Sequence, residues 1–128
     1  MIMDFITLED TADEIVTCTQ KDVDEANDAL MEIARRMLIE DTKIVLPVAF
    51  TAKRLGAVYA LHMAAVRSIG KDNLTSLNTE STRMDIYAQK AKFFQEEIDR
   101  LEKEIKAADF TGKEVGNFAR MQMWYGGY

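Results

Sequence analysis

The chain has 128 residues, enough for one domain, and its hydrophobic (48%) and charged (30%) fractions are typical of a soluble globular protein. The formal net charge is -6, whereas proteins that bind the phosphate backbone of nucleic acids are usually basic, so tight nucleic-acid binding is not expected. With 1 proline and 6 glycines, the sequence favours long helices over a barrel or sandwich built from many tight turns.

Two helices are predicted in the first third of the chain. Thr7 can cap a short helix that runs to about Val16, with Asp10 as the acid of a capping box. A second helix begins after Thr19, and Asp22 again supplies an acid three residues later. Its apolar residues are spaced by three and four, as on the buried face of an amphipathic helix: Val23, Ala26, Leu30, Ile33 and Met37.

A third helix is predicted from Pro47 to Ile69, after a polar break at residues 40–43. Proline suits the first turn of a helix, and Gly70 suits the position just past its end. The helix is apolar around most of its circumference and is therefore expected at the centre of the fold, before a loop at residues 71–80. Small residues recur along one stripe, which allows another helix to approach closely: Ala49, Ala52, Gly56, Ala60 and Ala64.

The fourth predicted helix, from Thr82 to Ala108, is the longest. Three acids on its outer face, Glu96, Asp99 and Glu102, each precede a base by four residues, a favourable spacing for solvated ion pairs. At about 1.5 Å per residue the helix would be roughly 40 Å long, so we expect it to protrude or to pack on another chain. A heptad pattern of apolar residues runs along it: Met84, Tyr87, Ala91, Phe94, Ile98, Leu101, Ile105 and Ala108.

Together these elements predict an all-α fold, a small bundle of about four helices with one long helix in its C-terminal half and an extended C-terminal tail. The predicted division is a helical bundle domain at residues 1–108 and an aromatic tail at residues 109–128, which includes Phe110. The tail either folds back over the bundle or binds a partner, since exposed aromatic residues are common at interfaces. The candidate partner-binding residues are Phe118, Met121, Trp124, Tyr125 and Tyr128.

No pattern of residues points to catalysis, a metal or a cofactor. One cysteine and one histidine cannot form a disulfide or the usual zinc site, and a di-iron bundle needs two Glu-x-x-His pairs. His62 is interpreted as a core or boundary histidine and Cys18 as a structural or incidental thiol. Glycine-rich phosphate loops and nucleophile elbows are missing from the sequence. We therefore expect a protein that is not an enzyme.

Targeting signals are also not recognisable. The first residues are acidic where a secretory signal would be basic, and no apolar stretch approaches the roughly 20 residues that span a bilayer. We therefore expect no membrane insertion, and the single cysteine, which cannot form an intrachain disulfide, favours a reducing compartment.

Charge is distributed unevenly along the chain. Residues 1–46 carry twelve acids and four bases, whereas residues 47–79 carry four bases and one acid. These segments are complementary helices within one fold, or they orient identical subunits in a ring with an acidic edge against a basic edge.

In their order along the chain, four segments resemble those of the small helical connector or adaptor proteins of tailed bacteriophages. These proteins lie beneath the portal at the head-to-tail junction. The resemblance covers most of residues 5–108 and rests on the order of the segments, since none of them is a signature motif. They are the opening Phe5-Ile6-Thr7-Leu8-Glu9, the acidic helix from Asp22 to Leu30, Ile44-Val45-Leu46-Pro47 before the helix with Leu55, Ala57, Tyr59, Ala60 and Leu61, and the helix from Ile86-Tyr87-Ala88-Gln89-Lys90-Ala91 to Leu101.

The resemblance implies a structural protein of the virion, assembled in the host cytoplasm. It implies a self-assembled ring, commonly of twelve copies, that docks on the portal protein and carries the stopper or tail protein below. DNA would pass through the ring without specific binding, which suits a negatively charged wall. By position in the family, Phe118, Trp124, Tyr125 and Tyr128 would anchor the tail on the portal.

The alternative is a cytoplasmic homo-oligomeric interaction or regulatory protein of the coiled-coil type. In that hypothesis the seam from Met84 to Ala108 pairs with the same helix of another copy. A DNA-binding repressor ranks last, because the only net-basic segment is the apolar third helix.

Overall fold

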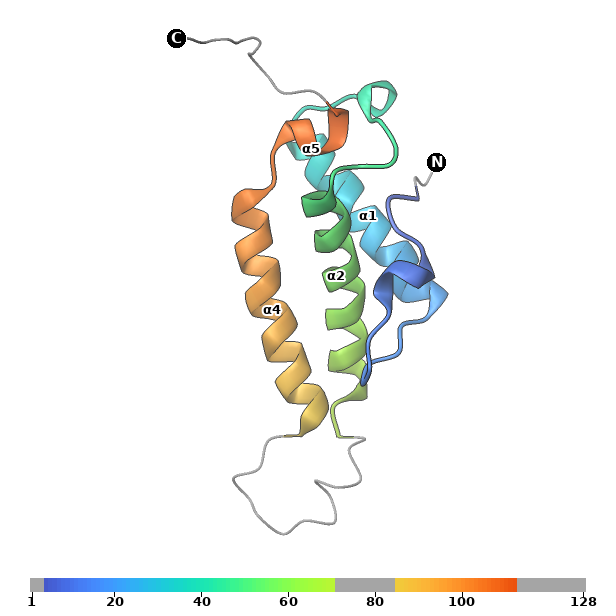
Figure 1. Ribbon diagram of the computed structural model, residues 1–128, viewed down its shortest axis with the longest axis vertical. Helices are drawn as coiled ribbons and strands as arrows, with labels where there is room; N and C mark the ends of the chain where they lie inside the picture. The colour runs from blue at the N-terminus through green and yellow to red at the C-terminus, as the bar shows by residue number, and fades with distance from the viewer. Residues whose placement is uncertain (1–3, 71–84, 113–128) are drawn as a thin grey trace.

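The computed structural model describes residues 4–70 and 85–112, and in these ranges the secondary structure is entirely helical (Figure 1). This confirms the predicted all-α bundle. The three long helices lie side by side with α2 in the middle, and α5 lies across the upper end of the view. None of these helices is long and apolar enough to cross a membrane. The helices are α1 (Gln20–Arg36), α2 (Phe50–Ser68), α4 (Ile86–Glu104) and α5 (Ala107–Thr111), with two short 3-10 helices, η1 (Leu8–Thr11) and η2 (Asp41–Lys43).

The N-terminal segment forms the predicted cap but a shorter helix. The Thr7 amide donates to the Asp10 carboxylate at 2.8 Å, and η1 then ends after one turn. The predicted extension to Val16 is wrong. The Asp13 carboxylate accepts hydrogen bonds from the amides of Ile15 and Val16, at 3.0 and 2.9 Å, so these amides are satisfied without a helix.

The first long helix, α1, begins as predicted. The Thr19 hydroxyl accepts a hydrogen bond from the Asp22 amide at 3.3 Å, and the Asp22 carboxylate accepts one from the Thr19 amide at 2.9 Å. This reciprocal pair satisfies two amides that have no partner inside the helix. The predicted apolar face is buried apart from Met37, which is half-buried.

The central helix, α2, begins at Phe50, three residues later than predicted. Pro47 precedes the helix instead of occupying its first turn. The cause is Ala49, which has extended backbone and whose amide donates to the Asp109 carbonyl at 2.9 Å, so the chain is held outside the helix here. At the other end Gly70 follows the helix with a φ of 95°, a backbone conformation that favours glycine.

The stripe of small residues on α2 allows the predicted close approach. Ala52, Ala60 and Ala64 are fully buried. A Cβ atom built on Gly56 would lie 2.6 Å from a terminal methyl carbon of Leu30 and 3.1 Å from one of Ile6. The neighbours that use this space are therefore α1 and the N-terminal segment.

The heptad pattern on α4 is buried within the chain. Ala91, Phe94, Ile98 and Leu101 are buried, and α4 packs along α2. The helix has 19 residues, about 28 Å, which is the same length as α2. The prediction that this helix protrudes is therefore wrong, and the alternative that it packs on another chain stays a prediction. Residues 82–84 lie outside the described residues.

The helix also ends at Glu104, before the predicted Ala108. Ile105 has extended backbone, and Lys106 begins a new cap in which its amide donates to the Asp109 carboxylate at 2.8 Å. The break changes the direction of the chain and places Phe110 in the core with no exposed surface.

Phe110 is the aromatic residue that joins α5 to the rest of the bundle. Its ring meets the ring of Phe5 edge to face at 5.9 Å between centroids, and its carbonyl accepts a hydrogen bond from the Val45 amide at 2.9 Å. Residues 109–112 were predicted as the start of the tail, but the structure packs them with the bundle.

Ion pairs join the acidic first third of the chain to the basic middle. Asp22 meets Arg67 at 2.7 Å, and Asp10 meets Lys53 at 3.6 Å. This confirms the interpretation that the two segments are complementary within one fold.

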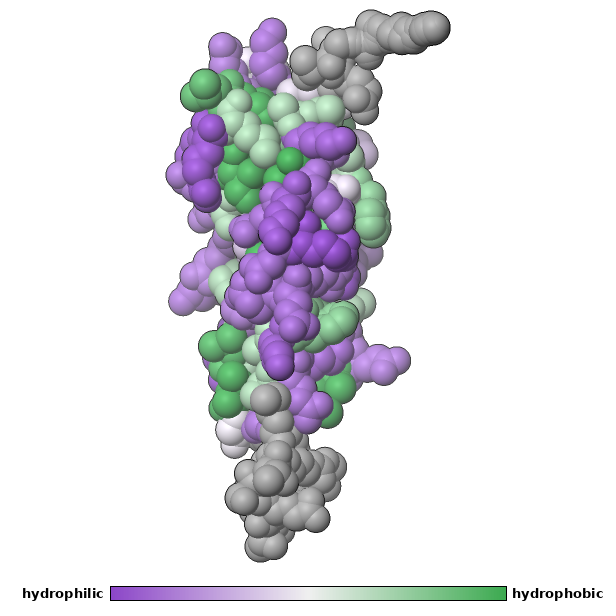
Figure 2. All heavy atoms as spheres, turned by 90° about the vertical axis from the view of Figure 1, so that its left-hand side faces the viewer, coloured by the Kyte–Doolittle hydropathy of each residue, from purple (hydrophilic) through white to green (hydrophobic). Residues whose placement is uncertain are grey.

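A further ion pair joins α2 to α4. Arg54 donates to both carboxylate oxygens of Glu97, at 2.8 and 3.0 Å. Along α4, Arg100 lies 3.6 Å from Glu97 and 3.3 Å from Glu104, where the sequence predicted a pair with Glu96. The charged outer face of α4 fills the centre of Figure 2.

Candidate protein-interaction site

The chain has one cysteine and one histidine, residue types often used in catalysis, and His62 lines a surface pocket beside Asp22 and Arg67. Cys18 is buried, and this burial raises the pKa of its thiol, so the reactive thiolate is disfavoured. His62 is half-buried on α2, and burial lowers its pKa. Within residues 4–70 and 85–112, no three His, Cys, Asp or Glu side chains are placed to hold a metal ion. The predicted partner-binding residues Phe118, Met121, Trp124, Tyr125 and Tyr128 lie outside the described residues.

Exposed apolar side chains gather at one end of the bundle. Of the eight large apolar residues that are exposed in the described part of the chain, four fall between positions 38 and 50. They lie in the connection from α1 to α2 and on the first residue of α2, at the upper end of Figure 1. We call this group the apolar end: Leu38, Val45, Leu46 and Phe50, with exposed fractions of 90%, 50%, 47% and 78%.

Leu38 occupies a backbone position that normally favours glycine. It follows the C-cap of α1, and its φ is 63°. Its amide donates to the Arg35 carbonyl at 2.9 Å, and the Ile39 amide donates to the Ala34 carbonyl at 3.0 Å. These are the two hydrogen bonds of a Schellman turn, in which the left-handed residue is usually glycine.

The leucine at this position is unfavourable within the isolated chain. A left-handed conformation costs a non-glycine residue roughly 1–2 kcal/mol. Packing does not offset that cost, because 90% of Leu38 is exposed. A contact outside the chain would account for a leucine here.

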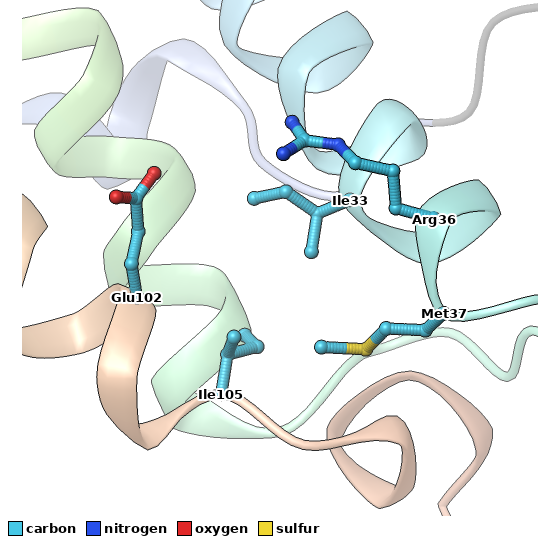
Figure 3. Close-up of a pocket in the computed structure, with 5 residues that line it drawn as sticks. All are labelled: Ile33, Arg36, Met37, Glu102 and Ile105. Carbon is cyan, nitrogen blue, oxygen red and sulfur yellow. The ribbon is translucent and has the colours of Figure 1, made fainter.

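A pocket lies next to the apolar end, between the C-terminal ends of α1 and α4 (Figure 3). We call it the α1–α4 pocket. Its volume is about 280 Å³. The side chains of Ile33, Met37 and Ile105 give it apolar walls, and Arg36 and Glu102 bring opposite charges to it from its two sides.

Tyr59 of the central helix α2 contacts Glu102, the acidic residue of this pocket. Its hydroxyl donates a hydrogen bond to the Glu102 carboxylate. Burial raises the pKa of Tyr59, and the hydrogen bond to Glu102 raises it further. The phenol therefore stays neutral and holds the Glu102 side chain in place. The apolar walls, the Arg36 guanidinium and the Glu102 carboxylate together have the chemistry to fit an apolar group that carries a polar atom.

Sequence reasoning did not identify either surface. Leu38 could have been found from the end of the apolar periodicity at Met37, because the next position of a helix end is commonly glycine. The pocket has no comparable signal, since its walls come from segments about 70 positions apart. Comparison with protein-family models, with curated proteins and with solved structures gave no match.

Proposed function

We propose that this chain is a structural subunit of a bacteriophage head-to-tail junction. It forms an oligomeric ring that joins the portal to the stopper or tail and lets DNA pass, and it catalyses no reaction. The observation that carries the proposal is the apolar end, where Leu38 and Phe50 expose most of their surface. Contacts with other chains would remove this surface from water, a favourable change of about 25 cal/mol per Å².

The charge of the described helices suits the passage of DNA. Glu25, Asp28 and Glu32 are exposed on the outer face of α1. Carboxylates on a channel wall repel phosphates and so prevent the DNA from adhering. This supports a ring that DNA crosses without specific binding.

The coiled-coil alternative was based on the heptad pattern of α4, and this pattern is accounted for by packing within the chain. The heptad residues from Ala91 to Leu101 are buried and α4 packs along α2 in the same chain. A homo-oligomeric regulatory protein would need a different surface for its self-association.

Affinity purification from cells that produce the chain with its native neighbours tests the proposal, with native mass spectrometry of what is recovered. We expect a closed ring of many copies together with a portal-sized protein. Recovery of only a dimer or tetramer of the chain, or of the chain with an unrelated host protein, would contradict the junction proposal.

The tail supplies a first variant for this assay. Trp124→Ala with Tyr125→Ala should abolish assembly while helix content and the midpoint of thermal unfolding stay close to those of the unchanged chain. The reason is that aromatic residues contribute a large part of the binding free energy at interfaces. A matched control is Lys92→Ala with Lys103→Ala, two exposed residues of α4, which should assemble normally. A large fall in the midpoint for the aromatic variant would instead place the tail in the core.

The apolar end supplies a second variant. Leu38→Gly should raise the free energy of unfolding by about 0.5–1 kcal/mol, because glycine adopts the left-handed conformation without strain. The same change should weaken ring formation, because it removes the exposed side chain. Chemical denaturation and native mass spectrometry measure the two effects.

Leu38→Ala is the control for this prediction. Alanine removes most of the side chain but keeps the strain, so it should weaken ring formation without stabilising the subunit. If Leu38→Gly assembles as well as the unchanged chain, the apolar end is not the ring contact.

A further inference from the structure

The described chain ends close to the α1–α4 pocket. Ile105, one wall of the pocket, lies seven positions before Gly112. Gly112 in turn packs beside Val45 of the apolar end, since a Cβ atom built on it would lie 3.8 Å from the Val45 Cβ. The remaining sixteen residues, 113–128, therefore start from the end of the bundle that holds the pocket.

These residues are long enough to reach the pocket. Twelve peptide units separate Gly112 from Trp124, which span up to about 40 Å when extended. The long helices measure only about 28 Å. Tethering also gives the tail an effective concentration on the order of millimolar, so a weak contact is sufficient.

The pocket matches the chemistry of a tryptophan side chain. Its walls are apolar, Arg36 can lie over an aromatic face, and the Glu102 carboxylate can accept a hydrogen bond from an indole N–H. Trp124 is the only tryptophan in the chain. Residues 113–128 also carry two bases and one acid, whereas the chain as a whole has a net charge of -6. The tail is thus opposite in charge to the bundle.

We infer that in the free subunit Trp124 inserts into the α1–α4 pocket of its own chain. The pocket then holds the tail on the bundle until a partner takes it. This goes beyond the proposed function, because it concerns the single subunit before assembly. The tail and the pocket can be tested in a monomer, whether or not the chain forms a ring.

The fluorescence of Trp124 tests the inference directly, because no other tryptophan contributes. The full chain is measured at a concentration where light scattering shows a monomer. We expect blue-shifted emission and protection from quenching by acrylamide. Met37→Glu introduces a charge on the half-buried wall of the pocket and should red-shift the emission and increase the quenching constant severalfold. Circular dichroism checks that the variant is folded.

Phe50→Glu is the matched control. It places the same charge on an exposed apolar residue at the same end of the bundle but outside the pocket, and it should leave Trp124 protected. Trp124 that is exposed in the unchanged chain would overturn the inference, and so would protection that survives Met37→Glu in a folded protein. Protection that grows with protein concentration would show that a second copy fills the pocket, which also overturns it.

Discussion

Phe110→Ala is expected to lower the free energy of unfolding by about 3–5 kcal/mol. The side chain has no exposed surface, and its ring packs edge to face on Phe5. Removing it leaves a cavity between α5 and the N-terminal segment, and α5 has only five residues with which to hold its place. Chemical denaturation followed by circular dichroism measures the change.

Phe93→Ala is the control for this prediction. Phe93 lies on α4 with 54% of its surface exposed, so its removal should cost less than about 1 kcal/mol. If Phe110→Ala costs no more than Phe93→Ala, then α5 is not part of the cooperative fold and the bundle ends before it.

The second large effect concerns Asp22, a carboxylate with 1% of the residue exposed. It accepts two hydrogen bonds from Arg67, at 2.7 and 2.9 Å, and one from the Thr19 amide. Asp22→Ala should lower the free energy of unfolding by about 2–3 kcal/mol, because hydrogen bonds to charged groups are lost together with the helix cap. We expect no larger loss of stability, because Arg67 is partly exposed and water can solvate its guanidinium once Asp22 is removed.

The same carboxylate makes stability depend on pH. The hydrogen bonds from Arg67 hold the pKa of Asp22 below its usual value. A carboxylate with a lowered pKa in the folded state stabilises the fold above its unfolded pKa of about 4, and this contribution is lost as the pH falls through the folded value. Denaturation at a series of pH values should therefore show a smaller loss of stability in acid for Asp22→Ala than for the unchanged chain.

Asp28→Ala gives the comparison, since Asp28 is an exposed acid on the same helix. It should leave both the stability at neutral pH and its loss in acid nearly unchanged. If the two substitutions had equal effects, Asp22 would stabilise the fold only through its negative charge and not through its specific hydrogen bonds.

The helix starts that follow threonine could be predicted because the cap is local. Thr7 with Asp10 and Thr19 with Asp22 form hydrogen bonds across three residues, whatever the rest of the fold does. The start of α5 uses the same bond between Lys106 and Asp109, but lysine is not a typical capping residue, so this start was missed.

The partner of the α4 seam could not be predicted from periodicity. A heptad pattern shows that one face of a helix is buried, but the same pattern serves a helix of the same chain or of another. Here α2 covers residues such as Phe94 and Ile98. The pattern also continues through Ile105, where the chain leaves the helix, so the length of α4 was overestimated.

The candidate site was the least predictable part of the molecule. The α1–α4 pocket depends on how the ends of two helices pack on α2, and residues such as Met37 and Glu102 are unremarkable in sequence. The aromatic tail stood out by composition alone and remains a prediction, because residues 113–128 lie outside the described structure.

The antiparallel contact between α2 and α4 also has a consequence for how the chain responds to mechanical force. Two helices of 19 residues lie side by side over their whole length, joined by a buried seam and by the pair Arg54–Glu97. A pull along the long axis of the bundle, on one helix against the other, loads all these contacts at once in shear. A pull across the axis would separate them one after another from an end. The helical bundle should therefore resist force along its length better than force that pulls its helices apart from one end.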